Sequence, residues 1–113
     1  MPIVDVQLVC PHGSDDPPAP AQALADALGR VWASPPGRTW VRVQLLSSAS
    51  YAENGAPVDE AELPAFVTVL HARPPHGDTL AAEVLAVTTA VAECLGRPIE
   101  RVHVQYAPPG AGR

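Results

Sequence analysis

The sequence predicts an α/β fold of the α+β kind, in which two consecutive β-α-β units form one four-stranded mixed sheet with two helices on one face. Three observations carry this prediction. Stretches of alternating apolar and polar residues flank stretches with helical spacing, this order occurs twice, and the prolines gather in the connections. We therefore expect a single domain over residues 1–113, built from pseudo-repeats at 2–55 and 64–107.

The first unit begins with a strand at Ile3–Val9, where apolar and polar side chains alternate. After a proline-rich connection, apolar residues at helical spacing predict a helix over Ala19–Trp32. The turn SPPGRT ends this helix, and a second strand is expected at Trp40–Leu46. The helix should pack on the sheet through one apolar stripe, made of Ala21, Leu24, Leu28 and Val31.

The second unit repeats this order after Pro64 with a strand at Ala65–His71. The turn RPPHGD follows and offers Asp78 as the N-cap of a helix. The last strand is expected at Arg101–Tyr106. The stripe of the second helix consists of Leu80, Val84, Val87, Val91 and Leu95.

The sheet face away from the helices is expected to be mixed in character. Both right-handed crossovers put their helices on the same side, so the other side receives the polar residues of the strands. These are Asp5, Gln7, Arg42, Gln44, Arg101, His103 and Gln105, together with Trp40 and Leu46. In a thin two-layer domain such a face is more naturally covered by another subunit than left open, so the pattern predicts association.

Composition narrows the classes of partner and the location. The 113 residues include 12 Asp+Glu against 7 Lys+Arg, none of them lysine, for a formal net charge of -5. Nucleic acids and acidic membrane surfaces need a basic footprint, so neither is expected as a partner. No secretion signal or membrane-spanning run is recognised, which favours a cytoplasmic protein. Cys10 and Cys94 match no metal or redox spacing, and we expect both to be reduced.

Several segments together resemble one known family. A proline directly after the initiator methionine heads PIVDVQL, and VRV follows in the next strand, as in the tautomerase superfamily. The segment LGRPIERVHVQY is similar to the end of the last helix and the last strand of its macrophage migration inhibitory factor-like (MIF-like) and fused 4-oxalocrotonate tautomerase-like members. The resemblance implies the tautomerase/MIF-like fold, with β-α-β pairs closing into a ring, and therefore a homotrimer.

The resemblance further implies a catalytic amino-terminal proline, which is Pro2 once Met1 is removed. A free α-amine titrates near pH 8, at about 7.7–8.0. An apolar pocket near cations would lower the pKa of this amine and let it act as a base near neutrality. The expected enzyme is a cofactor-independent tautomerase, without a metal, that isomerises a small anionic 2-oxo or enol carboxylic acid. Pro64 has a tertiary amide nitrogen and cannot act as a base.

The resemblance also suggests residues that bind the substrate. Arg42 lies in VRV, where the corresponding arginine of single-repeat members helps to bind substrate; alternatively it pairs with an acid such as Asp5. Arg73 follows the third strand much as a second substrate-binding arginine follows the first strand in those members. His12 stands roughly at that position in the first unit, and it either contributes to the site or is a solvated loop residue.

Four further residues are candidates for the same site. His103 occupies the place of a tyrosine in the inhibitory factor-like proteins and Tyr106 matches an adjacent tyrosine, so either could assist at the enol oxygen; His103 could also simply face a wet interior. Tyr51 would shield Pro2 from water, or belong to an ordinary polar loop. Glu53 could activate water beside a charged Pro2.

Two other functions stay open on the sequence. A protonated Pro2 could serve as an acid in a hydratase, dehalogenase or decarboxylase of short unsaturated acids. The chain could also be a trimeric binding module with vestigial activity.

Overall fold

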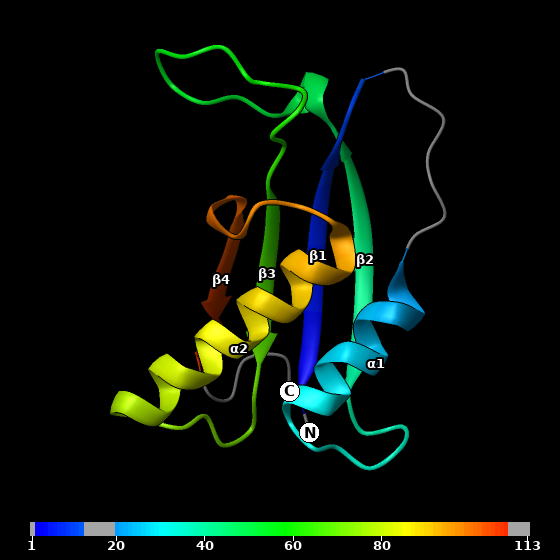
Figure 1. Cartoon of the computed structure of the whole chain (residues 1–113), viewed down its shortest axis with the longest axis vertical. Helices are drawn as coiled ribbons and strands as arrows, with labels where there is room; N and C mark the ends of the chain where they lie inside the picture. The colour runs from blue at the N-terminus through cyan, green and yellow to red at the C-terminus, as the bar shows by residue number, and fades with distance from the viewer. Residues whose placement is uncertain (1, 13–19, 109–113) are drawn as a thin grey trace.

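The computed structural model describes residues 2–12 and 20–108. It confirms the predicted fold class: one four-stranded mixed sheet carries both helices on one face (Figure 1). In chain order the elements are β1 (Ile3–Cys10), α1 (Ala21–Val31), β2 (Trp40–Ser47), the 3₁₀ turn η1 (Ser48–Ser50), β3 (Ala65–Leu70), α2 (Gly77–Leu95), the 3₁₀ turn η2 (Ile99–Arg101) and β4 (Val102–Tyr106).

The strand order across the sheet is β2-β1-β3-β4. Each β-α-β unit contributes a parallel pair, β1 with β2 and β3 with β4, and the two units join through the antiparallel pair of β1 and β3. This leaves β2 and β4 as the edges of the sheet. No helix in the described ranges is long and apolar enough to cross a membrane.

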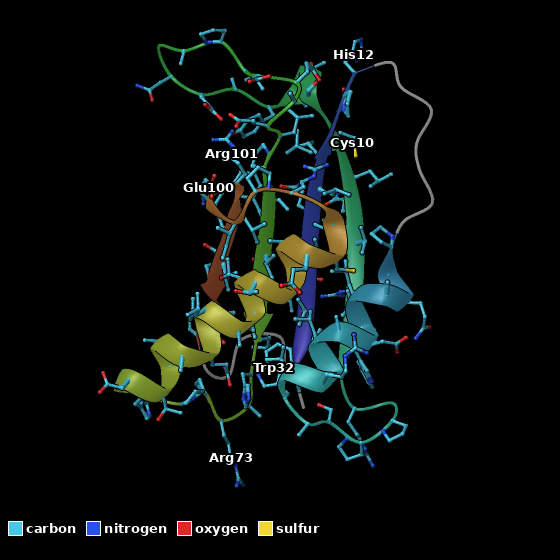
Figure 2. The ribbon with its side chains drawn as sticks, viewed as in Figure 1. Cys10, His12, Trp32, Arg73, Glu100 and Arg101 are labelled. Carbon is cyan, nitrogen blue, oxygen red and sulfur yellow. The ribbon has the colours of Figure 1, made fainter. Side chains whose placement is uncertain are left out.

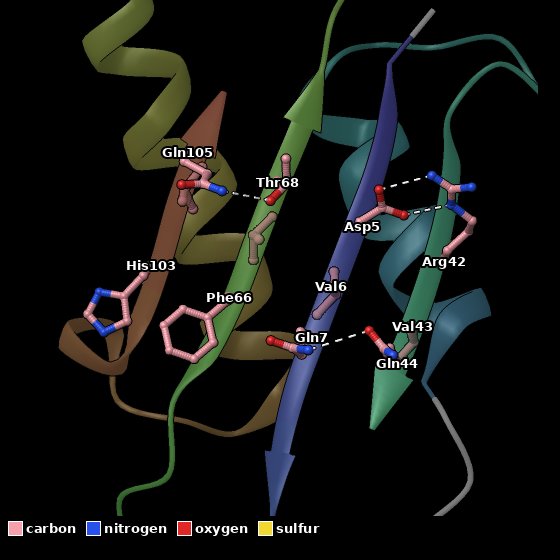
Figure 3. A pocket seen from close by; sticks show the side chains of 12 residues that line it. Asp5, Val6, Gln7, Arg42, Val43, Gln44, Phe66, Thr68, His103 and Gln105 are labelled. Carbon is pink, nitrogen blue, oxygen red and sulfur yellow. Dashed lines mark hydrogen bonds and ion pairs between the residues drawn. The ribbon is translucent and has the colours of Figure 1, made fainter. Parts of the chain in front are cut away.

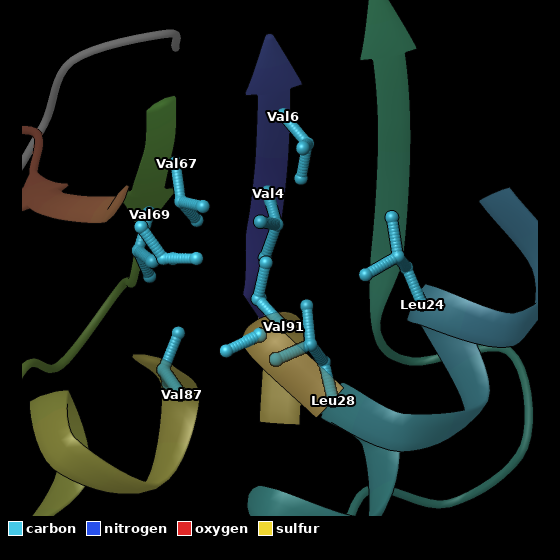
Figure 4. Close-up of a cluster of buried hydrophobic side chains, with 10 residues drawn as sticks. Val4, Val6, Leu24, Leu28, Val67, Val69, Val87 and Val91 are labelled. Carbon is cyan, nitrogen blue, oxygen red and sulfur yellow. The ribbon is translucent and has the colours of Figure 1, made fainter. Parts of the chain in front are cut away.

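The core lies between the sheet and the two helices, where the branched side chains of the central strands meet the apolar stripes (Figure 4). The middle of each predicted stripe is confirmed: Leu24 and Leu28 of α1, and Val87 and Val91 of α2, are fully buried. The stripe residues toward the helix ends are only half-buried. On the sheet side the same layer consists of Val4, Val6, Val67 and Val69.

Two local predictions are wrong. Asp78 is not the N-cap of α2: His76 is extended and takes that position, and Gly77 begins the helix with a φ of 57°, so Asp78 lies in the first turn. Its negative charge in the first turn still interacts favourably with the positive end of the helix dipole. Arg101 does not begin the last strand, because its N–H donates to the carbonyl of Pro98 at 3.0 Å and closes η2. Ala19, the expected start of the first helix, lies outside the described residues.

Candidate functional site

Pro2 lies at one end of the sheet, immediately before β1. It is buried, and its carbonyl oxygen accepts the N–H of Trp40 at 3.2 Å, which ties it to the start of β2. Trp32 and Arg73 lie at this same end of the sheet, whereas Cys10 and His12 lie at the opposite end (Figure 2). The candidate site is therefore the end of the sheet where β1 begins.

Arg73 brings a positive charge to the Pro2 end. It follows β3 in an exposed loop, and its guanidinium makes no hydrogen bond or ion pair with the rest of the described chain. A planar guanidinium with free donors suits the two oxygens of a carboxylate. Arg73 is thus the predicted substrate-binding residue that one chain brings to the same end as Pro2.

Tyr106 also belongs near this end, since it pairs with Val69 in the sheet while Val69 pairs with Val4. Its hydroxyl does not face open space, however, because it donates a hydrogen bond to Glu83 of α2. Burial, reinforced by Glu83, raises the pKa of Tyr106 far above its ordinary value. Tyr106 therefore keeps its proton, and its O–H is engaged as the donor to Glu83.

Two aromatic residues at the Pro2 end were not foreseen from the sequence. Trp32 ends α1, and its ring packs edge-on against His71 with 6.3 Å between ring centroids. The indole N–H of Trp32 is buried and has no hydrogen-bond partner in the described part of the chain. His71 follows β3, and its Nδ1 accepts the backbone N–H of Arg73 at 3.0 Å. The residues HAR after the third strand are the available signal, but by resemblance they predict a role only for Arg73.

The open face of the sheet holds Arg42 in a different setting. Its Nε and Nη2 donate to the two carboxylate oxygens of Asp5 at 2.6 and 2.9 Å (Figure 3). The hydrogen bond and charge of Asp5 raise the pKa of Arg42. The ion pair considered from the sequence is thus formed, although both side chains are at least half exposed, and such pairs contribute little to stability.

His103 lies on the same open face and stacks on Phe66, with 5.6 Å between ring centroids (Figure 3). Neighbouring polar side chains satisfy one another across the strands, as in Gln7 with Gln44 and Gln105 with Thr68. Phe66 pairs with Gln7, which is five residues after Pro2 in an extended strand, or roughly 16 Å along the sheet. Within one chain, His103 does not reach Pro2.

The remaining candidates gather at the far end of the sheet. His12 lies beside η1, where its N–H donates to Ser48 Oγ at 2.9 Å and its ring contacts Ser47 Oγ at 3.1 Å. Tyr51 packs against Phe66 and donates its hydroxyl to Glu53 at 2.7 Å. Because ten extended residues span roughly 30 Å, His12 and Pro2 of one chain lie far apart.

The chain was compared with known protein families, curated proteins and solved structures, and its fold is similar to several of the solved structures. No protein-family model and no curated protein matches the chain. Among solved structures, a fused 4-OT wild type symmetric trimer is similar with a TM-score of 0.68 and 22% identity, over 93% of this chain and 83% of that chain. The macrophage migration inhibitory factor of Giardia lamblia is similar with a TM-score of 0.60 and 15% identity, over 94% and 97%. The chain has the tautomerase-superfamily fold.

A third similar structure with the tautomerase-superfamily fold is Pt0534 inactivated by 2-oxo-3-pentynoate, with a TM-score of 0.68 and 14% identity over 93% of this chain and 83% of that chain. The fold implied by PIVDVQL and LGRPIERVHVQY is thereby confirmed. The roles of Pro2, Arg73 and the other candidates stay predictions.

Glu53 accepts hydrogen bonds from two donors. Its Oε2 accepts from the Tyr51 hydroxyl at 2.7 Å and from Arg101 Nη2 at 2.6 Å. These two hydrogen bonds, the tyrosine's being the larger influence, lower the pKa of Glu53. Arg101 also donates to the Glu62 carbonyl, so the cluster ties the loop between the two units to η2. Within residues 2–12 and 20–108, no group of three or more His, Cys, Asp or Glu side chains could hold a metal ion.

The Glu53 cluster predicts a pH dependence of stability. Because folding lowers the pKa of Glu53, its contribution is complete above the unfolded pKa of about 4.3 and is lost as the pH falls through the lower folded value. The urea midpoint of Glu53→Gln should therefore lie below that of the wild type at pH 7, and the gap should narrow below about pH 4.

The matched control is Glu100→Gln on η2, an exposed carboxylate with no ion pair to another described residue. Its midpoint should follow the wild type at both pH values. A gap for Glu53→Gln that stays constant from neutral to acid pH would contradict the assignment of the lowered pKa to this cluster.

Proposed function

We propose that this protein is a cofactor-independent tautomerase of a small 2-oxo or enol carboxylic acid, in which Pro2, freed by removal of Met1, transfers the proton. The observation that carries the proposal is the position of Pro2. It is buried at the start of β1, in a tautomerase-superfamily fold, at the sheet end that also holds the exposed guanidinium of Arg73.

The proposed chemistry assigns separate tasks to these two groups. The Pro2 amine takes a proton from carbon and returns it to the enol oxygen or the reverse, as a general base and then a general acid. Burial disfavours the protonated amine and so favours the basic form. Arg73 would hold the substrate carboxylate. Inactivation of Pt0534 by a 2-oxo acid supports this substrate class.

The state of Glu53 favours tautomerisation over the hydratase and dehalogenase alternative. Activation of water by Glu53 would require a carboxylate that accepts a proton readily. Glu53 already accepts hydrogen bonds from Tyr51 and Arg101, and its pKa is lowered. A carboxylate in this state is a poor general base.

We also propose a homotrimer as the working assembly. The similar structures include a symmetric and an asymmetric trimer of fused 4-OT. In this chain the polar face of the sheet is uncovered, and Trp40 on that face is 52% exposed. A neighbouring copy would cover this face and could bring His12, Tyr51, Arg42 or His103 to the Pro2 site, which one chain alone does not do.

The proposed function is tested by ketonisation of phenylenolpyruvate, followed by ultraviolet absorbance. Intact mass first establishes which preparation has lost Met1, and a preparation that retains Met1 serves as the matched control. Turnover is expected only for the Met1-free protein. Turnover of halogenated acrylates but not of enol acids would favour the hydratase or dehalogenase function. No turnover of either class would favour the binding module.

A further inference from the structure

The pairing of β1 with β3 brings a second titratable residue to Pro2. The antiparallel register runs from Leu8 opposite Ala65 to Ile3 opposite Leu70. At the far end it continues by one residue, because Val9 N–H donates to the Pro64 carbonyl at 3.2 Å. Continued by one residue at the near end, the same register sets Pro2 opposite His71.

The type of pair determines how close these side chains come. Hydrogen-bonded and non-hydrogen-bonded pairs alternate along an antiparallel ladder, and Val9 with Pro64 is of the bonded type. Pro2 is seven residues away from Val9, so its pair with His71 is of the non-bonded type, in which Cα atoms lie about 4.5 Å apart and side chains are closest. The Pro2 carbonyl agrees, since it points to the other neighbour and accepts from Trp40.

Alternation along the strands also sets the direction of both side chains. Val4 and Val69 point into the layer beneath the helices, and Pro2 and His71 each lie two residues from one of them. Trp32, which belongs to that same layer, contacts the His71 ring and so supports this direction. Pro2 and His71 therefore share one face at one end of the sheet.

The His71 ring is held in one tautomer and one orientation. A backbone N–H can only donate, so the bond from Arg73 at 3.0 Å makes Nδ1 the acceptor. In the neutral ring the proton is then on Nε2. The indole of Trp32 packs edge-on at an interplanar angle of 68° and limits rotation of the half-buried ring. His71 thus carries its one N–H on Nε2 of a restrained ring, at the position that the continued register sets opposite Pro2.

We propose that His71 is a catalytic residue of the Pro2 site, donating its Nε2–H to the substrate oxygen that gains charge during tautomerisation. The proposal rests on the proposed function. When the Pro2 amine takes a proton from the carbon beside the 2-oxo group, the C–H electron pair forms a carbon–carbon double bond. The π pair of the carbonyl moves to oxygen. The His71 N–H stabilises this oxygen until it receives the proton back from the Pro2 ammonium.

His71 suits this task better than the residues expected from the sequence. The hydroxyl of Tyr106 is committed to Glu83, and His103 of the same chain lies on the other face of the sheet. Arg73 is bound to His71 only through its backbone, which leaves its guanidinium for the carboxylate. The substrate would then be a short acid whose carboxylate and 2-oxo oxygen both face the loop from His71 to Arg73.

The experiment compares two variants that differ in the atom they replace. In His71→Asn the amide oxygen can still accept from the Arg73 N–H in place of Nδ1, but the Nε2–H is lost. In His71→Gln the longer side chain can present an amide N–H near the position of Nε2. Both are assayed as the full-length Met1-free protein on phenylenolpyruvate, with thermal unfolding recorded for each. His76→Asn, an exposed histidine that follows in the same connection, is the control.

The proposal expects kcat of His71→Asn to fall about 100-fold, as for loss of one oxyanion donor, with KM nearly unchanged. His71→Gln should recover about tenfold of this loss, and His76→Asn should match the wild type. The proposal is overturned if His71→Asn keeps kcat within about threefold of the wild type, or if both variants lose activity equally. If Pro2→Ala is inactive while His71→Asn is active, only the role of His71 fails. A wild type without turnover overturns the proposed function and this role together.

Discussion

Replacing Pro2 by alanine in the Met1-free protein is expected to lower kcat/KM for phenylenolpyruvate by about 100-fold or more, the usual contribution of one positioned general base. The proline ring fixes the backbone angle and holds a secondary amine in a buried position at the start of β1. An amino-terminal alanine has a primary amine that rotates more freely and reaches water. Steady-state kinetics measure the loss, and the urea midpoint establishes that the variant is folded.

Pro64→Ala is the matched control for this prediction. Pro64 begins the second unit as Pro2 begins the first, and it is fully buried before β3. Because Pro64 is buried, the substitution should reduce stability. Its nitrogen carries no proton to transfer, so kcat/KM should stay within about threefold of the wild type. Full activity in a folded Pro2→Ala protein would exclude the proposed mechanism.

The second large effect is expected on stability, from Leu28→Ala in α1. Leu28 is fully buried in the cluster that joins α1, α2 and the sheet. Truncation of a buried leucine costs about 2–5 kcal/mol, because the lost contacts leave a cavity that surrounding side chains fill only partly. A domain of this size is stable by about 5–15 kcal/mol, so the urea midpoint should fall sharply.

Leu85→Ala provides the same chemical change at an exposed position. Leu85 lies on α2 with 62% of its surface exposed. Its free energy of unfolding should change by no more than about 0.5 kcal/mol. Equal losses for Leu28→Ala and Leu85→Ala would show that α1 does not pack as described.

The arrangement of the elements could be predicted because it depends on local pattern. Alternation in Ile3–Val9 and helical spacing around Leu24 and Leu28 each identify an element and the face that it buries. The errors arose where a cap or turn depends on the backbone angles of single residues. Gly77, with its positive φ, begins α2 one residue before Asp78, and Arg101 belongs to the 3₁₀ turn after Pro98 and not to β4.

The partners of the polar side chains could not be predicted in the same way. Arg42 and Asp5 are 37 positions apart in the chain and become neighbours only through the register of β1 and β2. The sequence predicts Arg42 as a substrate residue or an ion-pair partner; the register shows that the ion pair with Asp5 forms, and the substrate role stays a prediction. The hydrogen bond of Tyr106 to Glu83 likewise required the position of α2 over β4.

By itself, the sequence determined the two β-α-β units, the buried faces and the difference between Pro2 and Pro64. These properties follow from periodicity and from covalent chemistry, which are local to the chain. Only the tertiary structure decided that Asp5 engages Arg42, that Tyr51 and Arg101 engage Glu53, and that His71 follows β3 at the Pro2 end. Strand register and helix packing bring distant residues together, and they result from the whole core at once.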